Sequence, residues 1–425
     1  MPQLLITGGR VVDPSQGLDR VTNVLIDDGK IAAFDVPATS NLPTLDAVGK
    51  IVAPGLVDLN TQLREPGFEE DETIQSGTRA ALVGGFTSIA CIPETDPPID
   101  SQASVEFIHQ KAMRAKNCHV YVLGCVSKNR EGNELAEIGS LVEAGAVGFT
   151  DATRPIWNSE LLRRALEYSL MFNKVILNHP EVPELSRGGV MHEGQTSLVL
   201  GLPGMPSDAE DVMTGRDIRL CESTGGRMHL VNVSCSITID LLRRAKQRGV
   251  RITAGICPWN FAFTEEQMRS FDPAWKLNPP LRATGHLDAC LAGLADGTID
   301  VISSGHAPRA SEKKMQELDL APFGMASLQT TLAMVVTYLI RPGKLDWPSA
   351  IAKLSTNPAK ILGIPKGTLA VGADADVVII DPDARWTLER QHFVKSSNTP
   401  LLGKEFFGRV AEVLVCGEAK LARDH

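Results

Sequence analysis

The chain has 425 residues, of which 43% are hydrophobic and 22% charged, and its formal net charge is -9. These values are ordinary for a globular protein of enzyme size, in which a single α/β barrel can span most of the chain. The acidic balance argues against nucleic acid or an anionic membrane surface as a partner, because both require a basic face.

Targeting signals and paired cysteines are the next features to consider. The first residues, MPQLLITGGRVVDPSQG, lack the basic region and the long apolar run of a secretion signal. No window approaches the ~20 apolar residues that cross a bilayer. None of the eight cysteines forms a Cys-x-x-Cys pair. We therefore expect a cytoplasmic protein with buried free thiols.

Both ends of the chain predict short β-strands separated by turns. LLITGGRVVDP, TNVLIDDGKIAAFD and the run from Val48 to Ala53 are rich in Ile and Val, with Gly and Asp at turn positions. Near the other end, GTLAVGADADVVIIDP and GRVAEVLVCGEAKL have the same character. We expect one small β-sandwich domain built from both termini, residues 1–53 together with residues 365–425.

The middle of the chain, residues 54–364, alternates short apolar strands with amphipathic helices. Stretches such as SELLRRALEYSLMF and SITIDLLRRAKQRG carry apolar residues at helical spacing. Strands are predicted at 55–63, 85–93, 118–125, 146–151, 174–179, 228–234, 251–257 and 300–305. Eight βα units in series predict an α/β fold of the (β/α)8, TIM-barrel type, with a functional mouth at the carboxyl ends of the strands.

Polar residues collect at these strand ends. On the first strand Asn60 and Gln62 alternate with apolar residues and so share a face, and Arg64 follows them. The other candidates follow later strands: Glu94, Asp151, His179, Asn232, Asn278, Arg282, Gly305 and His306. A single Asp or His at a strand end more often anchors a loop, so it is their convergence at one mouth that favours a site.

Long segments of the chain resemble bacterial dihydroorotases of the cyclic amidohydrolase superfamily. The first is PGLVDLNTQLREPGFEEDETIQSGTRAALVGGFTSIACIPETDPPID. Others are GLPGMPSDAEDVM, FDPAWKLNPPLR, DGTIDVISSGHAP, PFGMASLQTTL, STNPAKILGIPKGTLAVGADADVVIIDP and NTPLLGKEFFGRV. The resemblance covers nearly the whole chain and implies an amidohydrolase barrel connected with pyrimidine biosynthesis.

The resemblance also implies that the zinc site is degenerate. Catalytic members carry a His-x-His pair on the first strand, a histidine on the sixth, and an aspartate, both ligand and general base, after the eighth. Those positions here hold Asn60, Gln62, Asn232 and Gly305. Three further family histidines are replaced by Trp259, Asn260 and Arg309. Two family metal positions are retained, as Asp151 and His179.

Positions that contact substrate in the family are partly kept. Arg64 and Asn278 stand where the family holds the substrate's carboxylate and ring, whereas an asparagine after the second strand is replaced by Glu94. A carboxylate there would repel a dicarboxylate substrate, since two like charges at ~4 Å repel by about 4 kcal/mol at an effective dielectric of ~20. The candidate ligand-binding residues are Arg64, Glu94, Asn278, His306 and Arg309.

The chemistry of these losses argues against catalysis. Catalytic zinc takes three protein ligands and a water, and neutral amides are poor ligands for it. Without a metal the attacking water keeps its pKa of about 15.7 instead of about 7, and Gly305 removes the proton acceptor. We therefore expect no catalytic residues and no metal cofactor.

Our leading interpretation is a non-catalytic dihydroorotase-like protein. The family includes such chains, which assemble with the catalytic chains of aspartate carbamoyltransferase as structural partners. The resemblance thus implies a homo-oligomer or a hetero-oligomer with that enzyme. The turn-rich segment Ala307–Pro322 is our candidate for a contact or a lid.

Two alternatives remain open. The chain could be an active cyclic amidohydrolase with a rebuilt site, using zinc held by Asp151 and His179 with a new ligand, or using Cys235 or Cys257 as a nucleophile. It could instead be a sensor that binds a pyrimidine precursor through Arg64 and Asn278 without turning it over.

Overall fold

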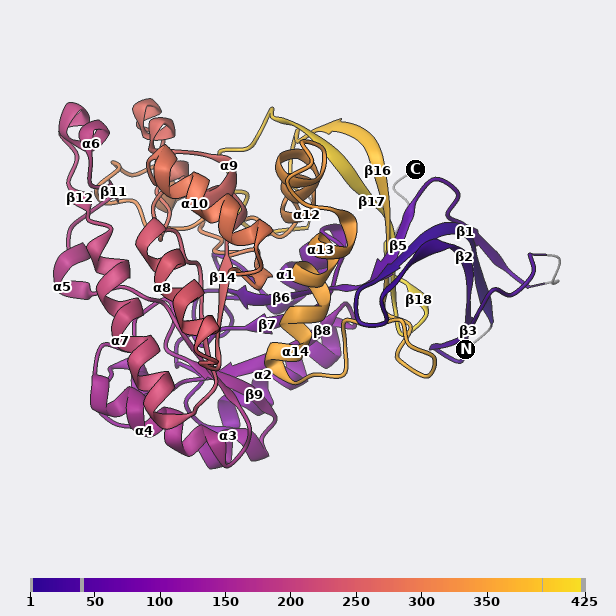
Figure 1. Ribbon diagram of the computed structural model, residues 1–425, viewed down its shortest axis with the longest axis horizontal. Coiled ribbons are helices and arrows are strands. Elements are labelled where there is room, and N and C mark those ends of the chain that lie inside the picture. The colour runs from indigo at the N-terminus through magenta and orange to yellow at the C-terminus, as the bar shows by residue number, and fades with distance from the viewer. Residues whose placement is uncertain (1–2, 39–41, 392, 422–425) are drawn as a thin grey trace.

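A parallel sheet of eight strands forms the centre of the larger part of the molecule, and helices pack around it (Figure 1). The computed structural model describes residues 3–38, 42–391 and 393–421. The sheet runs in chain order through β6 (Leu56–Thr61), β7 (Phe86–Cys91), β8 (His119–Gly124), β9 (Ala146–Thr150), β10 (Val175–Asn178), β13 (Met228–Leu230), β14 (Ile252–Ile256) and β15 (Val301–Ile302). All eight predicted strands are therefore confirmed, and the fold is the predicted amidohydrolase-type α/β barrel.

The first and last strands meet at their carboxyl ends, which joins the two edges of the sheet. A parallel β-bridge links Thr61 to His306, and the Gln62 amide donates to the His306 carbonyl at 2.9 Å. The buried carboxylate of Asp58 accepts the Ser304 amide at 2.7 Å and the Ser304 hydroxyl at 2.6 Å. This contact brings the ends of all eight strands to one mouth.

The helices follow the strands as the periodicity predicts. In α4 (Ser159–Leu170) the Asn158 side chain caps the first turn, and Leu162 and Leu166 face the core. Other barrel helices are α1 (Ile74–Val83), α2 (Gln102–Ala115), α3 (Ile138–Glu143), α7 (Asp208–Thr224), α8 (Ser236–Gln247) and α10 (Thr284–Ala295). The helical pattern read from SELLRRALEYSLMF and SITIDLLRRAKQRG is confirmed by α4 and α8.

Shorter elements fill the connections. These are η1 (Lys128–Arg130), α5 (Pro183–Ser186), β11 (Met191–His192), α6 (Gln195–Leu200), β12 (Gly204–Met205), α9 (Pro258–Ala262), η2 (Glu265–Ser270), η3 (Pro273–Trp275) and α11 (Ser311–Lys314). After the last barrel strand come α12 (Thr331–Val335), η4 (Val336–Ile340), α13 (Trp347–Ile351), η5 (Ala352–Thr356) and α14 (Asn357–Leu362). Helix α9 directly follows β14 and places Trp259 at the mouth.

Strands from both ends of the chain form a second sheet beside the barrel (Figure 1). Its members are β1 (Leu4–Asp13), β2 (Leu18–Asp27), β3 (Lys30–Phe34), β4 (Thr44–Asp46), β5 (Ile51–Pro54), β16 (Val377–Thr387), β17 (Glu405–Val415) and β18 (Glu418–Ala419). The predicted β-rich domain is present, and hydrogen bonds join its strands in one sheet with its own hydrophobic core. The division at residues 53 and 365 stays a prediction.

Across the described ranges, the chain has no helix that is both long enough and apolar enough to cross a membrane.

Candidate functional site at the barrel mouth

At the mouth, the side chains of Asn60 and Cys257 both contact the side chain of Asn232. The Asn60 amide donates to Asn232 Oδ1 at 3.1 Å, and the Cys257 thiol lies 3.0 Å from the same oxygen. All three residues are buried, and one hydrogen bond now joins two of the positions that bind zinc in the resembling enzymes.

Gly305 lies directly beside two bulky side chains. A Cβ atom built at residue 305 would lie 2.4 Å from Cys257 Sγ and 2.5 Å from the Trp259 ring. These distances are far below van der Waals contact, and the backbone has φ +58°, which disfavours any side chain. The indole and the thiol therefore occupy the space that an aspartate at this position needs.

Asp151 is turned toward the neighbouring loop. Its carboxylate accepts the Val126 amide at 2.9 Å, the Ser127 amide at 3.1 Å and the Ser127 hydroxyl at 2.5 Å. Burial raises the pKa of Asp151, although these hydrogen bonds oppose the shift. With both oxygens engaged, Asp151 anchors the loop after β8.

His179 lies beside an acidic residue that the sequence reading missed. Its Nε2 is 3.2 Å from Glu181 Oε2, which also accepts the Asn278 amide at 2.8 Å. Burial would raise the pKa of Glu181, but His179, Ser186 and Asn278 together lower it to about 2. A cavity of about 10 Å³ borders these residues, room for roughly one water.

Arg64 and Glu94 form a second paired group. Arg64 Nη1 lies 3.6 Å from Glu94 Oε1, and Arg64 is 2% exposed. Among the described residues, Nε and Nη2 of Arg64 and Oε2 of Glu94 have no hydrogen-bond partner. Glu94, predicted to repel a substrate carboxylate, thus lies against the arginine that was expected to hold that carboxylate.

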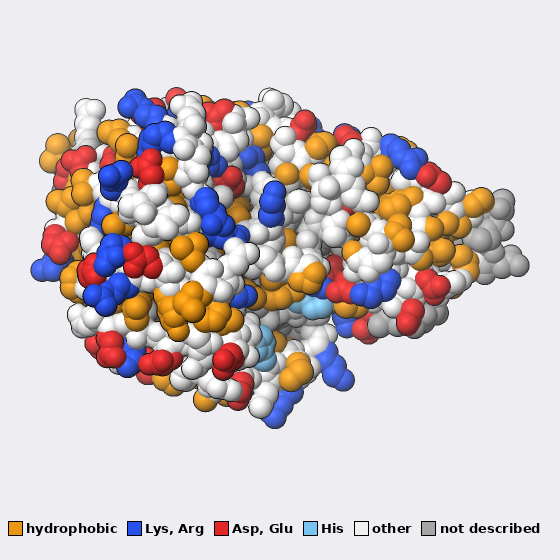
Figure 2. Space-filling view, turned by 60° about the horizontal axis from the view of Figure 1, so that its bottom comes forward, with side chains coloured by type: hydrophobic (Ala, Val, Ile, Leu, Met, Phe, Trp, Pro, Cys, Tyr) orange, Lys and Arg blue, Asp and Glu red, His pale blue; other side chains and the backbone are white. Residues whose placement is uncertain are grey.

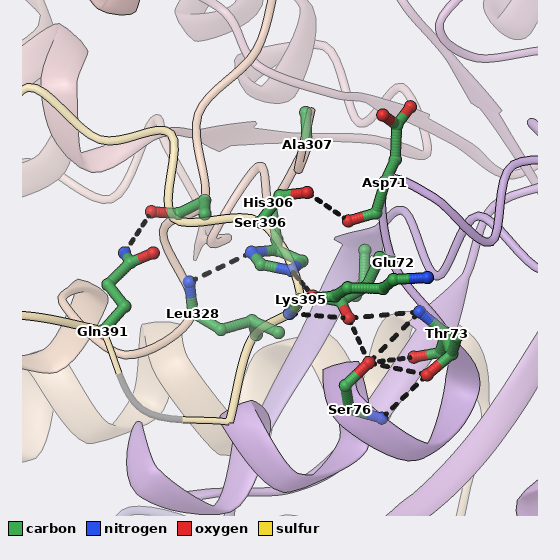
Figure 3. A network of polar contacts seen from close by, with 12 residues as sticks. Asp71, Glu72, Thr73, Ser76, His306, Ala307, Leu328, Gln391, Lys395 and Ser396 are labelled. Carbon is green, nitrogen blue, oxygen red and sulfur yellow. Dashed lines mark hydrogen bonds and ion pairs between the residues drawn. The ribbon is translucent and has the colours of Figure 1, made fainter. Parts of the chain in front are cut away.

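His306 is fully buried and faces Glu72. Its Nδ1 accepts the Ser327 amide at 3.1 Å, and its Nε2 lies 3.7 Å from Glu72 Oε2. Glu72 Oε1 in turn accepts the Lys395 amide at 3.3 Å, and Figure 3 shows this network from close by. His306 thus belongs to the packing between the barrel and the segment that follows β16.

Two further candidates serve similar structural contacts. Arg309 donates from Nε to the Phe323 carbonyl at 3.0 Å and lies 3.7 Å from Asp71. Arg282 donates to Ser234 Oγ at 3.0 Å and lies 3.5 Å from Glu210. Both guanidinium groups are engaged by protein partners.

The two cysteines considered as nucleophiles are completely buried. Burial raises the pKa of both Cys235 and Cys257 well above the ordinary thiol value. A nucleophilic cysteine requires the opposite shift, toward the thiolate. Arg282 opposes the upward shift at Cys235 and Ser303 opposes it at Cys257, but burial outweighs both, so the surroundings do not favour that role.

The mouth does not fit a catalytic zinc ion. Zinc needs three convergent ligand atoms of the imidazole, thiolate or carboxylate type. Over the described ranges, one trio of such side chains has ligand atoms within 4.8 Å of one another, and it consists of His119, Asp376 and Cys416, away from the mouth. Asp151 and His179 are held by Ser127 and Glu181.

Comparisons with known proteins agree with this architecture, which is that of amidohydrolases. Residues 49–237 match a family described as dihydro-orotase-like, and residues 226–416 match the amidohydrolase family. A dihydroorotase of Pelotomaculum thermopropionicum is 49% identical, covering 98% of this chain and 97% of the relative. One from Syntrophus aciditrophicus is 45% identical over 99% of this chain and 100% of the relative.

A solved structure with the same fold is L-hydantoinase (dihydropyrimidinase) from Arthrobacter aurescens. The TM-score is 0.88 at 23% identity, covering 99% of this chain and 96% of that chain. This likeness concerns the fold. From the long sequence matches, the chain belongs to the dihydroorotase-like amidohydrolases.

Proposed function

We propose that this protein is a non-catalytic, cytoplasmic dihydroorotase-like chain that serves as a structural subunit for aspartate carbamoyltransferase in pyrimidine biosynthesis. The observation that supports the absence of catalysis is the packing at Gly305, where Cys257 and Trp259 occupy the space that the general base needs. The relatives named dihydroorotase support a scaffold suited to that reaction, and the side chains at the mouth of this chain argue against catalysis on it.

The remaining polar groups of the mouth support the same proposal. Hydrolysis of a cyclic amide needs an activated water and an acceptor for its proton. The Asp151 carboxylate is occupied by three donors, and His179 is paired with Glu181. Asp151 therefore has no free carboxylate oxygen with which to accept a proton from water, and Nε2 of His179 is engaged by Glu181.

The partner half of the proposal rests on the family resemblance and on one surface. The segment Ala307–Pro322 is tied to the barrel, because Lys313 contacts Asp71 at 2.9 Å and Lys276 donates to the Asp319 carbonyl at 2.9 Å. On this segment, Met315 is nevertheless 84% exposed and Leu320 is 67% exposed. Exposed apolar side chains on an anchored segment favour a protein contact.

The catalytic half is tested by assaying dihydroorotate hydrolysis with zinc supplied, beside the dihydroorotase of Pelotomaculum thermopropionicum as a positive control. We expect activity only in the control. Turnover by this chain that depends on Asp151 and His179 would instead establish the rebuilt-site alternative.

The partner half is tested by co-expression with aspartate carbamoyltransferase catalytic chains, followed by size-exclusion chromatography. We expect one large complex, and a transferase that is less active or less stable when purified alone. Separate elution at micromolar concentration, with a transferase equally active alone, contradicts the proposal.

A sensor of pyrimidine precursors is the second candidate, favoured by the unpartnered groups at the mouth. Within the described part of the chain, Arg64 Nε and Nη2 and Asn278 Oδ1 are buried without hydrogen-bond partners, and such groups are costly unless something binds them. Addition of dihydroorotate or carbamoyl-aspartate should then raise the melting temperature of the protein, and Arg64→Met should abolish the shift. No shift with either compound rejects the sensor.

A further inference from the structure

The base of the barrel, opposite the mouth, carries a cluster of side chains that the proposed function does not use. His119 begins β8, Asp376 directly precedes β16, and Cys416 directly follows β17. They meet where the amino ends of the barrel strands adjoin the terminal sheet. Figure 2 shows this face, with pale-blue histidine side chains in the hollow between the two parts of the molecule.

The hollow is an open groove of about 790 Å³. His119 and Cys416 line it together with His109, Lys116 and Lys420. Cys416 is partly exposed, unlike the other seven cysteines, which are buried. A solute can therefore reach the cluster from solvent without opening the barrel.

The three candidate ligand atoms have the spacing of a zinc site. His119 Nε2 lies 3.1 Å from Asp376 Oδ2, and Cys416 Sγ lies 3.8 Å from the same nitrogen. Tetrahedral zinc with ordinary bond lengths requires about 3.3 Å between N and O and about 3.6 Å between S and N. Imidazole, carboxylate and thiolate are all ligands of zinc.

A lysine supplies positive charge to this cluster. Lys366 Nζ lies 2.7 Å from Asp376 Oδ2 and 3.0 Å from His119 Nε2. An ammonium only donates hydrogen bonds. The lone pair of His119 Nε2 and the carboxylate of Asp376 therefore both face the same cation, the Lys366 ammonium. Lys366 also contacts Asp374 at 2.8 Å. The ammonium would keep this ion pair if another cation took its place beside Asp376.

We propose that His119, Asp376 and Cys416 form a zinc site at the barrel base, which Lys366 occupies in the metal-free chain. Zinc binding releases the thiol proton of Cys416, displaces the ammonium toward Asp374, and leaves the fourth coordination position open to the groove. Asp376 is suited to this role, because its Oδ2 already lies 3.1 Å from His119 Nε2 and 2.7 Å from Lys366 Nζ.

The test is titration of the chelator-treated protein with Zn²⁺ by calorimetry and with Co²⁺ by absorption spectroscopy. We expect one ion per chain and a thiolate-to-cobalt charge-transfer band. Cys416→Ser should abolish the band, and His119→Ala should weaken binding by about tenfold or more, an energy of roughly 1.4 kcal/mol. Lys366→Met should tighten binding, because it removes the competing cation.

Two control variants locate the ion. His109→Ala changes the same groove outside the cluster, and His179→Ala changes the mouth, so both should bind zinc as the parent does. Circular dichroism confirms that each variant is folded. The proposal is overturned if Lys366→Met and the parent both fail to bind Zn²⁺, or if binding is unaffected in Cys416→Ser and His119→Ala. Neither result bears on the mouth.

Discussion

At the scale of single residues, Gly305 decides what the mouth can do. We expect Gly305→Asp to lower the free energy of unfolding by about 2 kcal/mol or more, because it combines a left-handed backbone with overlap against Cys257 and Trp259. Urea denaturation measures the loss, and Gly305→Ala should already show part of it. Adding Trp259→Ala to Gly305→Asp should recover some stability, and a fully stable Gly305→Asp protein would show that the indole is not in the way.

The second prediction at this scale concerns Glu181 and the pH dependence of the free energy of unfolding. Its pKa is lowered from 4.5 to about 2 in the folded protein, despite burial, by His179, Ser186 and Asn278. A lowered carboxyl pKa stabilises the fold above the unfolded pKa, and this stabilisation is lost as the pH falls from about 4.5 toward 2. We expect Glu181→Gln to reduce the acid-dependent loss by up to about 3 kcal/mol. Denaturation across this pH range checks it, and identical slopes in the two proteins contradict it.

At the scale of elements, the segment 393–401, here called the strap, packs against the mouth loops. Asn398 accepts the Arg309 amide at 2.9 Å and donates to the Gly324 carbonyl at 3.0 Å, and Ser396 donates to the Asp71 carbonyl at 2.6 Å. Figure 3 shows the Ser396 and Lys395 contacts beside Glu72. Asn398→Ala removes these side-chain contacts and a longer one to the Ala307 carbonyl at 3.4 Å, and it should loosen the strap locally.

Hydrogen exchange followed by mass spectrometry measures this effect. Amides of the strap should exchange faster in Asn398→Ala, while those of β9 and β10 keep their protection. Ser397→Ala is the matched control, since that neighbouring residue is exposed. Equal exchange in the two variants would mean that Asn398 does not hold the strap.

The eight strands were predictable because each is a short apolar run whose end is marked by polar residues. The sequence also predicted that Asn60, His179 and Asn232 gather at one mouth, since parallel strands end together. The directions of individual side chains were not predictable. That Asp151 faces Ser127, or that Trp259 fills the place beside Gly305, depends on contacts between different strands. Likewise His119 and Asp376 are 257 positions apart in the chain, so no local sequence pattern predicts that they meet.

At the scale of the whole molecule, the barrel and the terminal sheet are both complete, although Cys257 and Trp259 occupy the space beside Gly305. A structural role requires this combination and a catalytic role does not. The surface that we assign to the partner is the anchored segment carrying Met315 and Leu320. Helix α6 is a comparison surface of similar character, because Leu198 is 83% exposed. Stable protein interfaces bury roughly 1,200–2,000 Å² and depend most on a few well-packed apolar residues.

We therefore predict that Met315→Glu combined with Leu320→Glu prevents co-elution with aspartate carbamoyltransferase chains. Two carboxylates at the centre of an interface would be desolvated without partners, which should weaken association by about a hundredfold or more. Both residues are exposed, so the melting temperature of the isolated chain should not change. Leu198→Glu on α6 should leave the complex intact. If Leu198→Glu disrupts co-elution and the double variant does not, α6 is the contact and the assignment to Ala307–Pro322 is wrong.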